Sequence, residues 1–193
     1  MVVIGATGVV GRAVVEALRP RHDVVAASRN GEHRVDVTDP ASVSALLAST
    51  GDVDAVVCCA ASAPLTALED ESFIANLSAK LIGQVELVRR AIPRLRDGGS
   101  VTLTSGRIPE ATLGSAGGAL VNAGLEAFVE AAAVELPRGL RVNAVSPGWI
   151  RESLVQLGSD PTDGIPAGAV AEVYVEAVEG GMTGQTLVAR ASR

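Results

Sequence analysis

Three glycines near the start of the chain are spaced as in a phosphate-binding turn. The stretch VVIGATGVVGRAVVEAL places Gly5, Gly8 and Gly11 between a strand pattern and a helix pattern. Such a turn lets the backbone approach a pyrophosphate closely, and the helix that follows presents N–H groups to the anion. Glycine also serves ordinary turns, but this context favours a dinucleotide site, which would also include the loop residues Thr7, Val9 and Val10.

The end of the second strand pattern indicates which dinucleotide binds. The segment DVVAASRNG ends in Ser28 and Arg29, at a position where Asp or Glu would bind the ribose hydroxyls of NAD. Because arginine accommodates a 2′-phosphate, the pair predicts NADP(H) in preference to NAD(H); a solvated loop arginine is the alternative. Asp36 and Val37 follow the third strand and are predicted to contact the adenine.

Two adjacent cysteines and a single lysine are the other residues with reactive side chains. Cys58 and Cys59 have no second pair at metal-ligand spacing, so no metal site is expected. They suit small buried residues at a strand end in a reducing compartment, with a vicinal disulfide or a thiol nucleophile as the alternative. Lys80 is the only lysine, since every other basic side chain apart from the histidines is an arginine.

The elements that position these residues follow an alternating pattern. Strands are expected at residues 2–4, 24–28, 55–59, 101–104, 141–146 and 186–189, and helices at 11–18, 40–48, 70–95, 117–136 and 169–178. This alternation predicts one α/β domain over residues 1–193, a Rossmann-like doubly wound parallel sheet flanked by helices on both faces. Ligands would bind at the carboxyl ends of its strands.

The composition argues against several kinds of partner. A net charge of −6 disfavours nucleic acid, and one Trp, one Tyr and two Phe leave few rings for stacking on bases. No apolar run approaches the roughly 20 residues that cross a bilayer. The N-terminus lacks the pattern of a signal peptide. We therefore expect a cytoplasmic protein that acts on a small molecule.

Further stretches follow one another in an order typical of one enzyme family. DAVVCCAA matches a strand ending in Asn-Asn-Ala-Gly, GGSVTLTSG a strand ending in a catalytic serine, and LEAFVEAAAVELPRGLRVNAVSPG a helix, strand and Pro-Gly motif. MTGQTLV matches the approach to the last strand. The chain thus resembles the short-chain dehydrogenase/reductase family, which oxidises and reduces alcohols and carbonyls with NAD(P)(H). The resemblance implies cofactor contacts at Cys59, Ala60, Ala61, Pro147 and Gly148.

The resemblance also implies a proton relay that this chain lacks in part. In the family a Tyr transfers the carbonyl proton, and a Lys in a Tyr-x-x-x-Lys pair lowers the pKa of that Tyr and holds the nicotinamide ribose. A Ser polarises the substrate oxygen. Ser105 takes the serine position, whereas Gly118 replaces the Tyr and Asn122 replaces the Lys. Tyr174, the only tyrosine, lies in the last helical pattern, so the usual proton donor is absent.

The family also has an Asn on the long helix, where it positions a water that leads to the Lys. Lys80 takes this position in the register that places Gly83 and Pro93 on the family's usual glycine and proline. Lys80 and Asn122 thus look like an exchange of two polar groups across one pocket. We hypothesise that Lys80 reaches the ribose or the substrate oxygen, giving a predicted catalytic set of Ser105, Lys80 and Asn122. A solvated helix lysine is the alternative.

The segments around the expected pocket bear on substrate and assembly. Trp149 could cover the pocket or pack under a loop, and Arg107 and Glu110 could serve a substrate or simply be solvated. The small Gly118 could leave room for a bulky substrate. The segment 151–166, where the family often builds a lid, is short and predicts an open pocket or one completed by another subunit or protein. The helices at 70–95 and 117–136 resemble the family's subunit interface and predict a homodimer or homotetramer.

Two functions remain open on these grounds. The first is an NADP(H)-dependent reductase or dehydrogenase that acts on a carbonyl or alcohol, such as a quinone or a conjugated ketone, without the tyrosine acid. The second is a non-redox protein on the same scaffold, either a lyase, isomerase or cyclase, or a regulatory subunit that binds the nucleotide.

Overall fold

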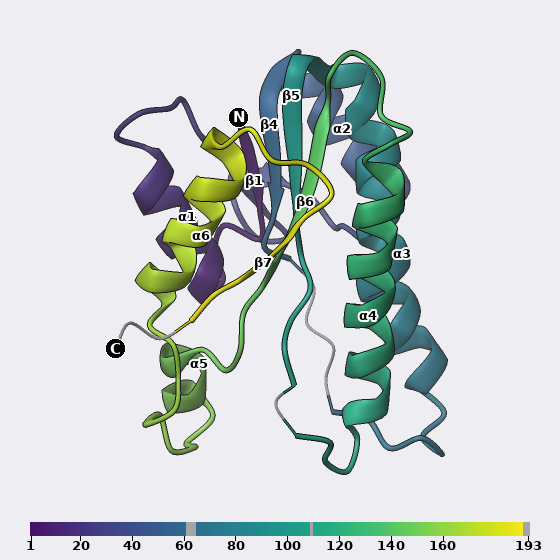
Figure 1. Cartoon of the computed structure of the whole chain (residues 1–193), viewed down its shortest axis with the longest axis vertical. Coiled ribbons are helices and arrows are strands. Elements are labelled where there is room, and N and C mark those ends of the chain that lie inside the picture. Colours follow the sequence, from purple (N-terminus) through teal and green to yellow (C-terminus); the bar gives the residue numbers. More distant parts are fainter. Residues whose placement is uncertain (61–64, 109, 191–193) are drawn as a thin grey trace.

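The computed structural model describes residues 1–60, 65–108 and 110–190, and its centre is a seven-stranded parallel sheet. The strand order is β3-β2-β1-β4-β5-β6-β7 (Figure 1). This order confirms the predicted doubly wound α/β fold, in which ligands bind at the carboxyl ends of the strands. The strands are β1 (Val2–Ile4), β2 (Val25–Ser28), β3 (His33–Arg34), β4 (Val53–Cys58), β5 (Leu95–Thr104), β6 (Arg141–Ser146) and β7 (Thr186–Val188).

Helices cover both faces of this sheet, as predicted. Two of them pack on one face and three on the other, and Figure 1 shows the sheet between these layers. On one side lie α1 (Val9–Leu18) and α6 (Ala167–Glu179); on the other lie α2 (Pro40–Thr50), α3 (Phe73–Ala91) and α4 (Ser115–Ala132). A short 3-10 turn, η1 (Ile92–Arg94), follows α3, and α5 (Arg151–Gln156) lies beyond β6.

The strands alternate between two apolar cores. Val2 and Ile4 pack into the core beneath α2, α3 and α4, whereas Val3 packs into the core beneath α1 and α6. This follows from the two-residue period of a β-strand, which sends successive side chains to opposite faces. Small aliphatic residues on both faces let the helices approach the sheet closely, and that closeness brings polar groups from α3 and α4 to the end of β5.

Several element boundaries differ from those expected. The strand predicted at 101–104 begins six residues earlier, at Leu95, because Gly98 turns with φ of 75° and the register against β4 shifts there. The helix predicted at 117–136 begins at Ser115, after Gly114 in the left-handed conformation, and ends at Ala132. Among the described residues, no helix combines the length and apolar character needed to cross a membrane.

Candidate functional site

The turn between β1 and α1 has room only for glycine at two of its positions. Gly5 has φ of 82°, and a Cβ atom built on it would lie 2.7 Å from the Ala60 amide nitrogen. A Cβ atom on Gly11 would lie 2.1 Å from the Gly5 carbonyl oxygen. The backbone is therefore pressed against the end of β4, and the first turn of α1 opens toward the carboxyl edge of the sheet. This is the cradle that a pyrophosphate requires.

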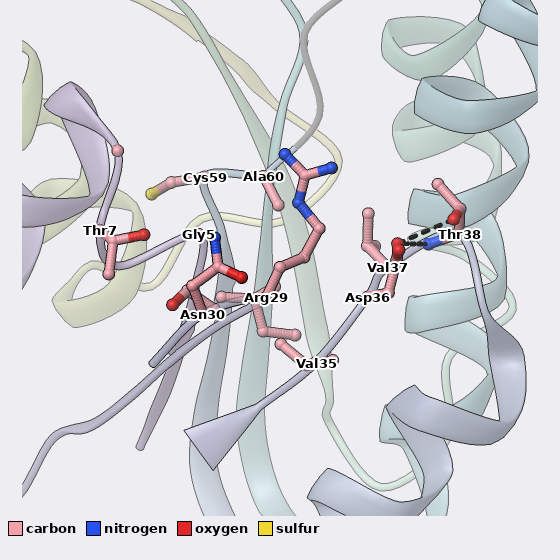
Figure 2. A pocket seen from close by; sticks show the side chains of 13 residues that line it. Gly5, Thr7, Arg29, Asn30, Val35, Asp36, Val37, Thr38, Cys59 and Ala60 are labelled. Atoms are coloured by element: carbon pink, nitrogen blue, oxygen red, sulfur yellow. Dashed lines mark hydrogen bonds between the residues drawn. The ribbon is translucent and has the colours of Figure 1, made fainter. Parts of the chain in front are cut away.

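A cavity of about 370 Å³ lies at the carboxyl ends of β1, β2 and β4 (Figure 2). Its lining includes Asn30, which the sequence did not single out. Val9, Val10 and Gly11 lie in the first turns of α1 and outside this lining, and Ala61 lies outside the described residues. The predicted cofactor residues that line the cavity are Gly5, Thr7, Gly8, Ser28, Arg29, Asp36, Val37, Cys59 and Ala60.

A hydroxyl donor and a cation that line this cavity, at Ser28 and Arg29, are available to a ligand. Ser28 is 5% exposed, and its hydroxyl is a buried group that finds no hydrogen-bond partner in the described chain. Arg29 extends along the cavity (Figure 2) and forms no ion pair with any described residue. The backbone and side chain of Thr38 donate to Asp36 and lower the pKa of its carboxyl group, with a smaller contribution from Arg29. The site therefore suits an anionic group beside a sugar.

The two cysteines at the end of β4 face opposite sides of the sheet. Cys58 packs into the core beneath α3 and α4, whereas Cys59 packs against the core beneath α1 and α6. Both thiols are free, and the opposite directions of the side chains contradict the vicinal-disulfide alternative. Burial raises the pKa of Cys58 to about 12 and that of Cys59 still further. Neither thiol is therefore set up as a nucleophile.

Lys80 is buried and hydrogen-bonded, which overturns the alternative of a solvated helix residue. The side chain is 6% exposed, and its Nζ donates to the Ser105 carbonyl oxygen at 2.6 Å and to Asn122 Oδ1 at 2.9 Å. The exchange inferred from the sequence thus brings Lys80 and Asn122 into direct contact. One turn further along α3, Gln84 bonds both the N–H and the carbonyl of Thr104. Two α3 side chains therefore hold the end of β5.

The environment of Lys80 makes its charge costly. Burial lowers the pKa of its ammonium group to about 8, while Cys58 and Glu126 act in the opposite direction. A lysine with this pKa is protonated in part near neutral pH and can exchange a proton there. Lys80 does not line this first cavity, so its ammonium group acts on it only through a neighbour.

The side chain of Ser105 faces inward. Its hydroxyl donates to Glu126 Oε1 at 2.8 Å, and the Ser146 hydroxyl donates to the same oxygen at 3.0 Å. A serine hydroxyl has one hydrogen, which here is directed at a carboxylate, and Ser105 is 2% exposed. Polarisation of a substrate oxygen by Ser105 stays a prediction that requires this hydroxyl to turn away from Glu126.

The position predicted for the family's tyrosine, Gly118, is covered by hydrocarbon. A Cβ atom built on Gly118 would lie 3.0 Å from Ile108 Cδ1, so the Ile108 side chain occupies the space above this glycine. The expectation that Gly118 leaves room for a bulky substrate is therefore wrong for this arrangement of the loop. No proton donor stands at this point of α4.

A second cavity, of about 860 Å³, lies beyond the ends of β5, β6 and β7. Trp149 is 46% exposed and lines it, so the alternative of packing under a loop is wrong. Pro147 is buried and lines neither cavity; its carbonyl accepts from the Arg107 backbone at 2.7 Å. The other lining residues are Arg107, Ile108, Glu110, Thr112, Gly148, Asp163, Ile165, Val188, Ala189 and Arg190.

The short segment after β6 does not close this cavity. The helix α5 is tied back at its base, because the Arg151 N–H donates to the Ile165 carbonyl at 2.9 Å and the Ala167 N–H donates to Glu152 at the same distance. No residue of α5 lines the cavity. The arrangement is that of an open cleft, as the shortness of this segment predicted.

Comparison with known proteins gives a consistent result. A family described as enoyl-(acyl carrier protein) reductase matches residues 5–176. The 3-oxoacyl-[acyl-carrier-protein] reductase FabG of Escherichia coli strain K12 is 31% identical over 185 residues, covering 82% of this chain and 76% of that protein. The chain belongs to the short-chain dehydrogenase/reductase family. In the register predicted from the sequence, the family's Asn, Ser, Tyr and Lys positions would be taken by Lys80, Ser105, Gly118 and Asn122.

Solved structures agree with this assignment to the short-chain dehydrogenase/reductase family. The protein lin1944 from Listeria innocua superposes with a TM-score of 0.92 at 35% identity, covering 98% of both chains. A small-chain dehydrogenase in complex with NADPH superposes with a TM-score of 0.83 at 27% identity, covering 97% of this chain and 94% of that one.

Besides Asn30, sequence reasoning missed three residues around Lys80, Ser105 and Gly118. Glu126 lies four residues after Asn122, one helical turn along α4, and this spacing could have shown that the two share a face. Gln84 stands in the same relation to Lys80 on α3. Ile108 carried no such signal, because its position over Gly118 depends on the path of a loop.

Proposed function

We propose that this short-chain dehydrogenase/reductase binds NADP(H) and uses it to reduce a carbonyl or oxidise an alcohol. The observation that carries the proposal is the first cavity, where a free buried hydroxyl at Ser28 and the cation of Arg29 stand where an acid would select NAD. The glycine turn at Gly5 supplies the cradle for the pyrophosphate. Further support comes from the relative of 27% identity that was solved with NADPH.

When bound, NADP(H) supplies or accepts the hydride. The chain's own residues hold the cofactor and the substrate in position beside each other. The first cavity would hold the adenine half, and Gly148 and Trp149 border the second cavity, where a substrate would bind. Since Gly118 gives no acid, the proton would come from water or a substrate hydroxyl. The loss of a general acid costs roughly 10²–10⁴-fold in rate. Quinones and conjugated ketones, which need less help from an acid, are therefore the proposed substrates.

A titration of the pure protein with NADPH and NADH tests the cofactor assignment. We expect NADPH to bind at least about tenfold more tightly, and Arg29→Ala to abolish that preference while leaving NADH binding unchanged. Arg34→Ala is the matched control, because this exposed arginine belongs to the neighbouring strand β3 and does not line the cavity. Equal affinity for both nucleotides in the wild-type protein would overturn the assignment.

A second candidate function is a non-redox or regulatory role for the same nucleotide site. Ile108 over Gly118 and the inward hydroxyl of Ser105 favour it, because both remove polar groups from the place where a substrate oxygen would be held. Incubation with NADPH and a panel of quinones and conjugated ketones separates the two functions. Consumption of NADPH supports the oxidoreductase; tight NADPH binding without consumption on any substrate supports the regulatory or non-redox role.

We also propose a cytoplasmic homodimer or homotetramer that associates through α3 and α4. Exposed aliphatic side chains on these two helices support this arrangement, among them Ile74, Ile82 and Leu120. Isolated exposed aliphatics are common, but several on neighbouring helices indicate a surface that another protein covers.

A further inference from the structure

The two cavities are separated by the backbone at Gly106, here called the strip, and Asn122 lies beneath it. The first cavity ends at Cys59 and Ala60, which follow β4, and the second begins at Arg107, which follows β5. Gly106 lies immediately before Arg107, and a Cβ atom built on it would be 3.3 Å from Asn122 Nδ2. A dinucleotide held by its adenine half in the first cavity reaches the second cavity only by crossing this strip.

The contact with Lys80 fixes which way the Asn122 amide points. A lysine side chain offers N–H donors and no acceptor while it is protonated, so the amide oxygen must face Nζ, at 2.9 Å. The amide nitrogen, Nδ2, is then turned away from Lys80, and the edge of the amide lies against Gly106, with Nδ2 at 3.3 Å and Oδ1 at 3.5 Å from a Cβ atom built there. Without this contact, a side-chain amide could present either its oxygen or its nitrogen to the strip.

The amide nitrogen of Asn122 is available to a ligand. Asn122 is 8% exposed, and its Nδ2 donates no hydrogen bond to any described residue. Although Nδ2 has no partner in the described chain, it is not completely sealed from solvent, so part of its surface remains accessible. Glycine at position 106 keeps that access open, because any side chain there would contact Asn122. A nearly buried donor without an acceptor is the feature expected where a ligand supplies the acceptor.

We propose that Lys80 is a positioning residue that orients Asn122, so that Asn122 Nδ2 donates a hydrogen bond to a sugar oxygen in the nicotinamide half of NADP(H). The inference rests on the proposed binding of NADP(H). It replaces the hypothesis that Lys80 itself reaches the ribose, because Lys80 Nζ is buried and already donates to the Ser105 carbonyl and to Asn122 Oδ1, whereas Asn122 Nδ2 has no acceptor among the described residues. The titratable groups that face Lys80 are the Cys58 thiol from β4 and the Glu126 carboxylate from α4.

A purely structural role for Lys80 makes a different prediction. Lys80 and Gln84 together bond the last residues of β5, so both could serve only to hold that strand end against α3. In that case any partner for Lys80 at position 122 would suffice. The two roles can be told apart with a variant at position 122 that keeps the oxygen acceptor for Lys80 and removes the N–H donor of Asn122.

Asn122→Asp makes this separation, because the carboxylate still accepts from Lys80 but donates no hydrogen bond. We expect NADPH to bind Asn122→Asp about tenfold or more weakly than it binds the wild-type protein. Adenosine 2′,5′-bisphosphate, which contains only the adenine half, should bind both proteins equally. Gly106→Val covers Asn122 without changing it and should give the same selective loss. Thermal unfolding establishes that each variant is folded.

A double-mutant cycle tests whether Lys80 acts through Asn122. Lys80→Met should weaken NADPH binding, but Lys80→Met added to Asn122→Leu should cost nothing further, since the group being oriented is gone. Unchanged NADPH affinity in both Asn122→Asp and Gly106→Val overturns the inference, and so does an additive cycle. Failure of the wild-type protein to bind NADPH would instead overturn the proposed function, so the two failures are distinguishable.

Discussion

The ammonium group of Lys80 lies between α3, β5 and α4, where water solvates it poorly. Its pKa falls to about 8, mainly through burial. When the pH is below this pKa, the folded protein holds a poorly hydrated positive charge on Lys80. Above it the amine is neutral and can still donate its two hydrogens to the Ser105 carbonyl and Asn122. The arrangement is therefore stable in both protonation states, and the charged state has the higher cost.

This cost predicts how Lys80→Met changes stability with pH. The folded pKa of about 8 is below the unfolded value of 10.5, so the unfolded chain binds more protons between these two pH values. Wild-type stability relative to the variant should therefore rise with pH across that window, by about 3 kcal/mol in total. Urea unfolding of both proteins on either side of the window measures the difference. A difference in unfolding free energy that does not change with pH would contradict the assigned pKa.

Ile108 predicts the result of restoring the family's tyrosine. In Gly118→Tyr the new ring must displace Ile108, whose Cδ1 lies 3.0 Å from where a Cβ atom would stand. We expect a loss of about 1–3 kcal/mol in the free energy of unfolding, typical of overpacking. Ile108→Ala in the same chain should recover part of that loss, and Ile108→Ala alone serves as the control. If both tyrosine variants are as stable as their parents, Ile108 does not fill this space.

At the scale of elements, the approach of α3 to α4 determines whether the polar pair can form. Gly117 allows this approach, since a Cβ atom there would lie 3.2 Å from Phe73 Cε2 and 3.3 Å from Leu77 Cδ2. Further along α4, a Cβ atom on Gly124 would lie 3.4 Å from Leu81 Cδ1, which is an ordinary contact. Small residues facing large ones bring the helix axes close enough for Lys80 to reach Asn122.

Gly117→Val should therefore disturb both the packing and the site. The added methyl groups would push against Phe73 and Leu77, and we expect about 1–3 kcal/mol of destabilisation together with weaker NADPH binding. Gly168→Ala in α6 is the control, because a Cβ atom there meets nothing within 4 Å and alanine favours a helix. Thermal unfolding and NADPH titration of both variants measure the effects; equal behaviour of the two would show that this helix spacing is not required.

The features predictable from the sequence were those set by local pattern. The glycine turn and the alternation of strands and helices depend on neighbouring residues, and both were found where expected. The direction of the Ser105 hydroxyl was not predictable, because Glu126 meets it only after α4 packs on the sheet. Burial of Lys80 was equally hidden, since Phe73 and Leu77 share its side of α3 with Gln84, a mixture that fits a surface or a core.

At the scale of the molecule, the layer of α3 and α4 exposes three large apolar side chains. Ile74 is 68% exposed, Ile82 52% and Leu120 55%, whereas the opposite layer of α1 and α6 contributes none of the large exposed hydrophobic residues in the described chain. This asymmetry supports the proposal that the first layer forms the subunit interface. A second copy of the chain would present the same two helices, as a symmetric interface requires.

The proposed assembly predicts a mass of at least twice that of one chain in light scattering. Leu120→Glu places a charge on α4 and should shift the protein toward the monomer, because a desolvated carboxylate without a partner is costly in an interface. Leu157→Glu is the matched control: Leu157 is 73% exposed but follows α5, away from α3 and α4. Its mass should equal that of the wild-type protein. Equal masses for the two variants would show that the interface lies elsewhere. A monomeric wild-type protein would show that there is no such assembly.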